Sequence, residues 1–188
     1  MGNLQVNQLK KDELDALQKD THFDGKELKN MYKQFRKETP AGVIAKEDFF
    51  QVLTAMGISD TFLQDLLFKA FANSKTGSIR FEDLVHTLSI ITRGTTDEKL
   101  KFAFQLFDIE CSGAITKRDL LKVLESFFKL TGPQITISGK TFETPSELAD
   151  HFFDVFDADN TGKITLAQYA EGAKKHKDII SSLSLWER

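Results

Sequence analysis

The chain has 188 residues and a net charge of −3, so it can form one domain or two small lobes and lacks the basic excess typical of nucleic-acid binding. Its single cysteine, Cys111, excludes an internal disulfide and indicates a reducing compartment. No run of about 18 apolar residues predicts a membrane span, and the N-terminus lacks the apolar core of a secretory signal, so we expect a cytoplasmic protein.

Residues 1–22 are expected to form an N-terminal segment ahead of the first repeated unit. Gly2 after Met1 partly matches the N-myristoylation pattern M-G-x-x-x-[ST], although Val6 stands where the pattern has Ser or Thr. Two interpretations stay open, an unmodified terminus and a lipid on Gly2. We expect association with a membrane only if Gly2 is lipidated.

The next stretch predicts a helix–loop–helix unit, because apolar residues recur at helical spacing on both sides of a loop that contains Gly42. With Gly42 at position 6 of a twelve-residue EF-hand calcium loop, Lys37 takes position 1, where the first carboxylate belongs. A lysine ammonium repels a cation, and Pro40 stiffens the loop. We therefore expect loop one to hold no metal.

A second unit of the same kind begins near Asp60, and its loop has Gly77 at position 6. Ala72 at position 1 offers no ligand oxygen, and Lys75 adds positive charge. Loop two is therefore also predicted to be free of metal. The sequence Arg93-Gly94-Thr95 then predicts a hinge between two lobes.

Loop three, with Gly113 at position 6, has the most complete ligand set in the chain. Its position 12 is Asp119, which is one methylene shorter than the usual Glu and closes on Ca²⁺ with difficulty; the smaller, octahedral Mg²⁺ tolerates a monodentate Asp better. We expect weak binding of calcium or magnesium here. The predicted ligands are Asp108, Glu110, Ser112, Ala114 and Asp119.

Between loops three and four, the alternation in residues 134–137 and the following Ser138-Gly139 predict a short extended piece and a turn. Thr144 with Glu147 three residues later predicts a helix start. Loop four nearly matches D-x-[DN]-x-[DN]-G-x₅-E, but a neutral Gln replaces the closing Glu, so we expect an impaired site. Its predicted ligands are Asp157, Asp159, Thr161, Lys163 and Gln168.

The sequence Gly-x-Ile occurs in all four loops, each time between amphipathic helices, and a repeat of this kind explains the whole chain. It predicts an all-α fold of four EF-hands paired into two lobes, with short strands that pair the loops. We place the N-terminal lobe at residues 23–92, the C-terminal lobe at 93–175, and a C-terminal helix or tail at 176–188.

Three stretches carry a resemblance to a known family: Phe23-x-x-x-Glu27-Leu28-x-x-x-Tyr32-x-x-Phe35, Thr39-Pro40-Ala41-Gly42 and Arg93-Gly94-Thr95-x-Asp97-Glu98-Lys99-Leu100. Over about its whole length the chain resembles the neuronal calcium sensors, which include recoverin, frequenin and the potassium-channel-interacting proteins; calcineurin B and calaxin are related alternatives. The resemblance implies an N-lobe crevice for a target helix. Its implied lining is Tyr32, Phe35, Phe49, Val52, Leu53, Met56, Phe81, Leu84, Val85 and Leu88.

The four histidines are scattered, and the sequence contains no nucleophile–base pair or phosphate-binding glycine motif, so we predict that the protein is not an enzyme. The resemblance and the loops together favour a regulatory or adaptor protein that binds an amphipathic helix of a larger partner, such as a channel, kinase, phosphatase or cytoskeletal motor. Calcium or magnesium would bind weakly and would not be required. The alternative is a true calcium-sensor switch, myristoylated at Gly2 and membrane-associated.

Overall fold

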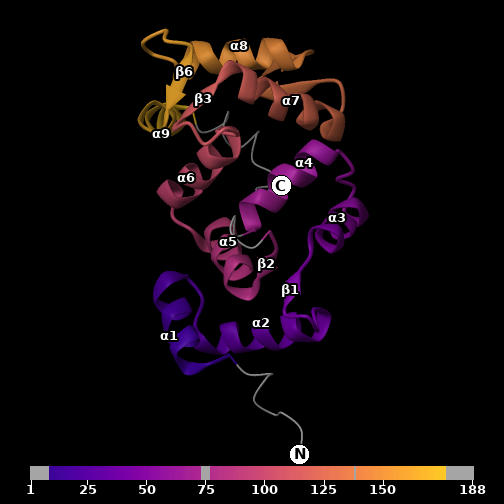
Figure 1. Cartoon of the computed structure of the whole chain (residues 1–188). Helices are drawn as coiled ribbons and strands as arrows, with labels where there is room; N and C mark the ends of the chain where they lie inside the picture. The colour runs from indigo at the N-terminus through magenta and orange to yellow at the C-terminus, as the bar shows by residue number, and fades with distance from the viewer. Residues whose placement is uncertain (1–8, 73–76, 138, 177–188) are drawn as a thin grey trace, which may run out of the picture. The chain divides into compact units, whose positions relative to one another are not determined.

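A computed structural model of the chain describes residues 9–72, 77–137 and 139–176. The helices are α1 (Lys11–Asp20), α2 (Gly25–Glu38), α3 (Lys46–Ala55), α4 (Thr61–Phe71), α5 (Phe81–Arg93), α6 (Thr96–Phe107), α7 (Lys117–Thr131), α8 (Pro145–Phe156) and α9 (Leu166–Lys175) (Figure 1). The strands are β1 (Val43–Ile44), β2 (Ile79–Arg80), β3 (Ala114–Thr116), β4 (Ile135–Ile137), β5 (Lys140–Phe142) and β6 (Lys163–Thr165). The predicted all-α fold of helix–loop–helix units is confirmed.

Capping side chains explain where several helices begin. The Asp24 side chain accepts hydrogen bonds from the amides of Lys26 and Glu27, and the Glu27 carboxylate accepts one from the Asp24 amide, so α2 starts with a capping box. At α8 the Thr144 hydroxyl accepts from the Glu147 amide, and Pro145 occupies the first helical position. The helix start predicted at Thr144 is therefore confirmed.

Short antiparallel strands pair the loops two by two. In the β1–β2 pair Ile44 lies opposite Ile79, and in the β3–β6 pair Ile115 lies opposite Ile164. Each isoleucine follows the glycine of its own loop by two residues, and the glycine of loop four, Gly162, has a φ of +76° that favours glycine. The loop pairing predicted from the Gly-x-Ile repeat is confirmed.

The chain divides into two compact units, one formed by Met1–Ala55 with Leu67–Thr95 and the other by Met56–Leu66 with Thr96–Arg188. Residues 56–66 belong to the second unit, where the Asp60 carboxylate accepts hydrogen bonds from Ser126 and Lys129 of α7. Sequence reasoning did not anticipate this placement, because no local pattern links Asp60 to a helix about sixty residues later.

In the first unit, α1 lies against α2 and α5. Its Leu14 and Leu17 pack into a buried cluster that also contains residues of α2 and α5: Leu28, Phe35, Phe81 and Val85. Residues 11–20 were predicted only as part of an N-terminal segment, so the helix was missed. The stretch is rich in charge and shows just two leucines at helical spacing, which is too short a pattern to identify a helix alone.

The core of the second unit is aromatic. The rings of Phe152 and Phe156 on α8 stack with centroids 4.2 Å apart, and Phe156 also stacks on Tyr169 of α9 at 5.8 Å. Gly172 lets α9 approach closely, because a Cβ there would clash with the Phe156 ring. The Tyr169 hydroxyl is buried and has no hydrogen-bond partner among the described residues, and burial raises its pKa.

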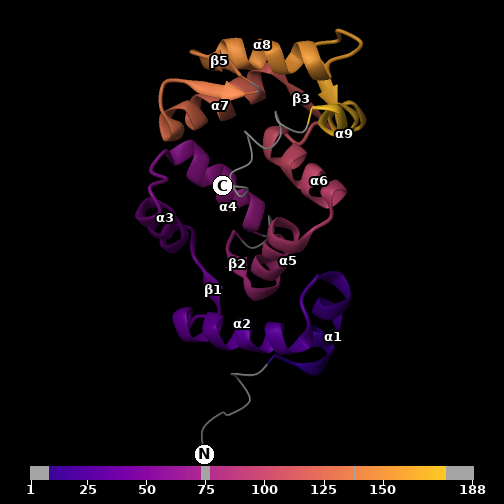
Figure 2. The same cartoon turned by 180° about the vertical axis from the view of Figure 1, so that it is seen from behind.

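The linker between loops three and four forms the hairpin β4–β5, in which Ile137 pairs with Lys140. The hairpin contributes to the second unit, since Phe142 is buried and stacks on His151 of α8 at 5.1 Å, and Figure 2 shows β5 beside α8. The short extended piece predicted here is confirmed. Its turn includes Ser138, which lies outside the described residues.

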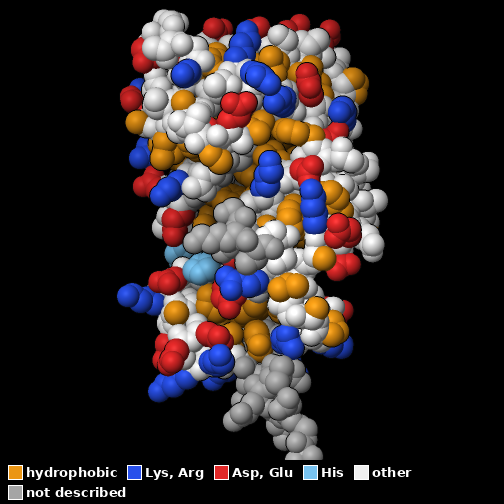
Figure 3. Space-filling model, viewed as in Figure 1, with side chains coloured by type: hydrophobic (Ala, Val, Ile, Leu, Met, Phe, Trp, Pro, Cys, Tyr) orange, Lys and Arg blue, Asp and Glu red, His pale blue; other side chains and the backbone are white. Residues whose placement is uncertain are grey.

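Acidic and basic side chains are interspersed on the face seen in Figure 3. None of the helices in the described part of the chain is long and apolar enough to cross a bilayer. Gly2 and residues 177–188, which hold most of the predicted C-terminal helix or tail, lie outside the described residues.

Candidate functional site

Loop three is organised around the buried Asp108 at its first position. Asp108 Oδ1 accepts from the Ser112 amide at 2.8 Å and lies 3.1 Å from Ser112 Oγ, and Asp108 Oδ2 accepts from the Gly113 amide at 2.8 Å. Ser112 Oγ is also 2.9 Å from the Ala114 carbonyl oxygen. Oxygens of three predicted ligands are therefore together, whereas the Glu110 side chain is exposed.

The closing residue of loop three, Asp119, is only 1% exposed. Its Oδ2 accepts a hydrogen bond from Thr116 Oγ1 at 2.8 Å. Its Oδ1 is buried and has no partner among the described residues. A buried carboxylate oxygen without a partner costs free energy, which a cation would offset, so the donor set of loop three fits a divalent metal.

Loop four gathers its predicted ligand oxygens around the Thr161 hydroxyl. Thr161 Oγ1 is 3.4 Å from Asp157 Oδ1, 3.0 Å from Asp159 Oδ1 and 3.3 Å from the Lys163 carbonyl oxygen. Hydrogen bonds from Thr161 and then from the Gln168 side chain hold the pKa of Asp159 below its usual range. The oxygens of four predicted ligands are thus together, and the fifth residue, Gln168, contacts the group by donating to Asp159.

The side-chain oxygen of Gln168, the closing residue of loop four, is already hydrogen-bonded within the protein. This oxygen, Oε1, accepts from the Thr165 amide at 2.8 Å and from Thr165 Oγ1 at 2.9 Å, in a capping box at the start of α9. Among the described residues, no three His, Cys, Asp or Glu side chains form a metal-binding group. An ion in either loop would therefore depend on hydroxyl and carbonyl oxygens as well, as EF-hand ligand sets do.

A second basic side chain, which sequence reasoning did not use, reaches loop one from the end of α2. The guanidinium of Arg36 lies against the loop backbone, because a Cβ at Gly42 would clash with its Nη1. Arg36 and the exposed Lys37 both place positive charge at this loop. Loop two is described only in part, since residues 73–76 fall outside the described ranges. The absence of metal from both loops stays a prediction.

The ten residues predicted to line the crevice fall into three groups by the exposure of their side chains. Four are buried, namely Phe35, Leu53, Phe81 and Val85, and four are half-buried, namely Tyr32, Phe49, Leu84 and Leu88. Val52 is 56% exposed and Met56 is 70% exposed, and these are the large hydrophobic side chains exposed within the described ranges. Phe35, Phe81 and Val85 pack with α1, so the structure uses them in the core of the first unit.

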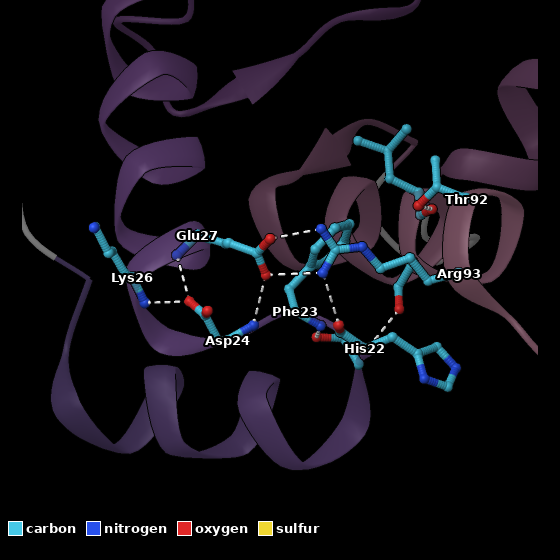
Figure 4. Close-up of polar contacts among 10 residues, drawn as sticks. His22, Phe23, Asp24, Lys26, Glu27, Thr92 and Arg93 are labelled. Atoms are coloured by element: carbon cyan, nitrogen blue, oxygen red, sulfur yellow. Dashed lines mark hydrogen bonds and ion pairs between the residues drawn. The ribbon is translucent and has the colours of Figure 1, made fainter.

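A polar cluster in the first unit was missed by sequence reasoning (Figure 4). Arg93, the last residue of α5, donates to both carboxylate oxygens of Glu27, at 2.9 and 2.5 Å, and to the His22 carbonyl oxygen at 3.1 Å. Its guanidinium lies 4.6 Å from the centre of the Phe23 ring, and the His22 amide donates to Ser89 Oγ at 2.7 Å. The cluster holds the start of α2 to the end of α5.

This cluster predicts an acid-sensitive contribution to stability. The hydrogen bond from Arg93 lowers the pKa of Glu27 from 4.5 to about 2. Because the folded-state pKa is depressed, the contribution is complete above pH 4.5 and is lost as the pH falls from there towards about 2. We expect the melting temperatures of the unaltered protein and Glu27→Gln to differ by a constant amount above about pH 5 and to converge near pH 2.

The control for this prediction removes the partner. In an Arg93→Gln background, Glu27→Gln should change the melting temperature by an amount that depends much less on pH. A pH-dependent difference that persists without Arg93 would show that another group depresses the pKa of Glu27.

The comparisons with known proteins cover both units. The family model of an EF-hand domain pair matches residues 97–174, which include loops three and four, and that of the USP32 N-terminal domain matches residues 6–113. The calcium-binding protein NCSA of Dictyostelium discoideum is 48% identical over 185 residues, which is 98% of each chain. The chain therefore belongs to the EF-hand calcium-sensor family.

Proposed function

We propose that this protein is a non-enzymatic regulatory or adaptor protein that binds an amphipathic helix of a larger partner, with weak or absent dependence on calcium. The observations that carry the proposal are two exposed apolar side chains, Val52 on α3 in the first unit and Met56 at the first position of the second unit. Each of these side chains offers an apolar contact to the apolar face of an amphipathic helix. Methionine suits such a surface because its flexible side chain adapts to different partners.

The proposal includes binding of calcium or magnesium at loop three and, more weakly, at loop four. The relative NCSA is a calcium-binding protein by name, which supports this part. In loop three the ion would be held by Asp108, Ser112, the Ala114 carbonyl and Asp119. When bound, a divalent cation supplies positive charge among these oxygens. Weak affinity follows from ligand charge, because EF-hand affinity rises with the number of carboxylate contacts and Gln168 is neutral.

A calcium-sensor switch is the second candidate, and the buried Asp119 Oδ1 favours it. A ligand shifts a conformational equilibrium only by its differential affinity for the two states. An ion that provides Asp119 Oδ1 with its missing partner would bind more tightly to the conformation in which this oxygen faces the loop. Anchoring through a lipid at Gly2 would belong to this second candidate.

The test uses a synthetic amphipathic helix of about 18 residues, with leucines along one face and lysines elsewhere. Calorimetric titration of the full chain is carried out with a calcium chelator and again with calcium. We expect affinities within about threefold of each other, and a loss of at least about tenfold in the double variant Val52→Asp, Met56→Asp. Gln51→Asp, at an exposed neighbouring position on α3, is the matched control and should bind normally.

Each other outcome rejects part of the proposal. Binding that requires calcium would reject the adaptor and support the switch. Equal binding by the unaltered chain and by the double variant would show that neither Val52 nor Met56 contributes to binding of the helix.

A further inference from the structure

Thr116 contacts the closing residue of loop three in two ways. Its hydroxyl donates to Asp119 Oδ2 at 2.8 Å and accepts from the Asp119 amide at 3.1 Å, as the N-cap of α7. Its backbone is fixed on the other side, since Thr116 pairs with Lys163 in the β3–β6 ladder beside the two loops (Figure 1). One oxygen of the Asp119 carboxylate is therefore held by the protein itself.

In loop four, too, a threonine at the start of the following helix holds the closing residue, but there no oxygen is left for an ion. Thr165 holds Gln168 with its hydroxyl and its amide, and both bonds go to the single side-chain oxygen of the glutamine. Gln168 therefore has no free oxygen for an ion, because an amide oxygen accepts about two hydrogen bonds. The Asp119 carboxylate has a second oxygen, Oδ1, which is buried and unpartnered within the described part of the chain. Of these two loops, loop three is therefore the one that keeps a closing oxygen for an ion.

One closing oxygen distinguishes between the two common divalent ions. Calcium takes about six to eight oxygen ligands, and an EF-hand usually supplies two of them from one carboxylate at position 12. Magnesium takes six in near-octahedral geometry, retains waters readily and accepts a monodentate carboxylate. Asp119 cannot easily turn to offer both oxygens, since Oδ2 is bonded and the residue is almost fully buried.

We infer that Thr116 determines the ion selectivity of loop three: by holding Asp119 Oδ2 it leaves one carboxylate oxygen for the ion, and the loop prefers magnesium to calcium. This inference rests on the proposed function, because loop three must bind a divalent cation. The inference goes further than the proposed function, because it assigns the preference of loop three for magnesium over calcium to Thr116, which is not one of the predicted ligands.

The experiment is a pair of calorimetric titrations of the full chain, one with MgCl₂ and one with CaCl₂. The amide resonance of Gly113 is followed by NMR to assign the binding to loop three. In Thr116→Val, which lacks the hydroxyl, we expect calcium affinity at loop three to rise about tenfold and magnesium affinity to change by less than about threefold. Thr116→Ser, which retains the hydroxyl, should behave like the unaltered chain.

The control separates selectivity from the loss of a helix cap. Thr144 caps α8 with its hydroxyl but lies outside both metal loops, so Thr144→Val removes a cap of the same kind. It should lower stability and leave both ion affinities unchanged. If Thr116→Val and the unaltered chain have the same ratio of calcium to magnesium affinity, the inference is overturned while the metal site stands. If the Gly113 resonance responds to neither ion, metal binding at loop three fails and the inference fails with it.

Discussion

Replacing Gln168 by Glu should raise the calcium affinity of loop four by about two orders of magnitude, from the millimolar towards the micromolar range. Loop four already gathers Asp157, Asp159, Thr161 and the Lys163 carbonyl, so the missing component is a closing carboxylate. Glutamate also fits the capping box, and its side chain is one methylene longer than that of Asp119, so it can turn both oxygens towards the ion when calcium binds.

The same substitution should make the ion-free protein less stable. The Gln168 side chain now hydrogen-bonds to Asp159, and this bond contributes to the lowered pKa of that carboxyl. A glutamate would replace the bond with repulsion between two carboxylates, which calcium would then relieve. We therefore expect a lower melting temperature in chelator and a larger rise on addition of calcium than the unaltered chain shows.

Calorimetry at micromolar calcium measures the affinity, and Gln168→Glu combined with Asp157→Asn is the control. The combined variant keeps the new glutamate but loses the charge at the first loop position, so its gain in affinity should largely disappear. Unchanged calcium binding in Gln168→Glu would mean that the closing residue does not limit loop four.

Local pattern was enough to predict the fold and the pairing of the loops. The Gly-x-Ile sequence recurs in each loop, so it predicted the short strands that pair the loops, and the structure adds that Ile115 lies opposite Ile164. The ligand positions follow from spacing within twelve residues, which needs no knowledge of distant parts of the chain. The loops and their short strands could therefore be predicted from residues that are close together in the sequence.

The state of the closing residues could not be predicted in the same way. Spacing identified Asp119 and Gln168 at position 12. It did not show that Thr116 holds one carboxylate oxygen of Asp119, or that Thr165 holds the single side-chain oxygen of Gln168. That result depends on the side-chain conformation adopted at the helix start, where the cap and the ion compete for the same group.

Contacts between distant residues were missed for a related reason. Glu27 and Arg93 both occur in the stretches that resemble the neuronal calcium sensors, but nothing in either stretch shows that they meet. The same holds for Asp60 and Ser126, which lie in different helix–loop–helix units along the sequence. Such pairs form only when the tertiary structure brings their helices together.

Replacing Asp60 by Ala should lower the free energy of unfolding by about 3 kcal/mol, as the sum of a lost helix cap and a lost acceptor. Asp60 Oδ1 accepts from the Leu63 amide at 3.0 Å, which caps α4, and from Ser126 Oγ at 2.8 Å. Ser126 is 2% exposed, so its hydroxyl would be left buried without this acceptor. Burial alone would raise the pKa of Asp60, but the hydrogen bonds from Lys129, Leu63 and Ser126 outweigh it and lower the pKa.

The ion pair with Lys129 should account for little of this loss. Lys129 Nζ lies 2.9 Å from Asp60 Oδ2, but the lysine side chain is 66% exposed, and exposed ion pairs are weakened by water and salt. Urea unfolding of the second unit should therefore rank the losses as Asp60→Ala, then Asp60→Asn, then Lys129→Ala. Asparagine ranks second because it can still cap α4 and accept from Ser126 but carries no charge. A loss in Lys129→Ala equal to that in Asp60→Ala would instead make the ion pair the dominant contact, and the Asn variant should then be as unstable as the Ala variant.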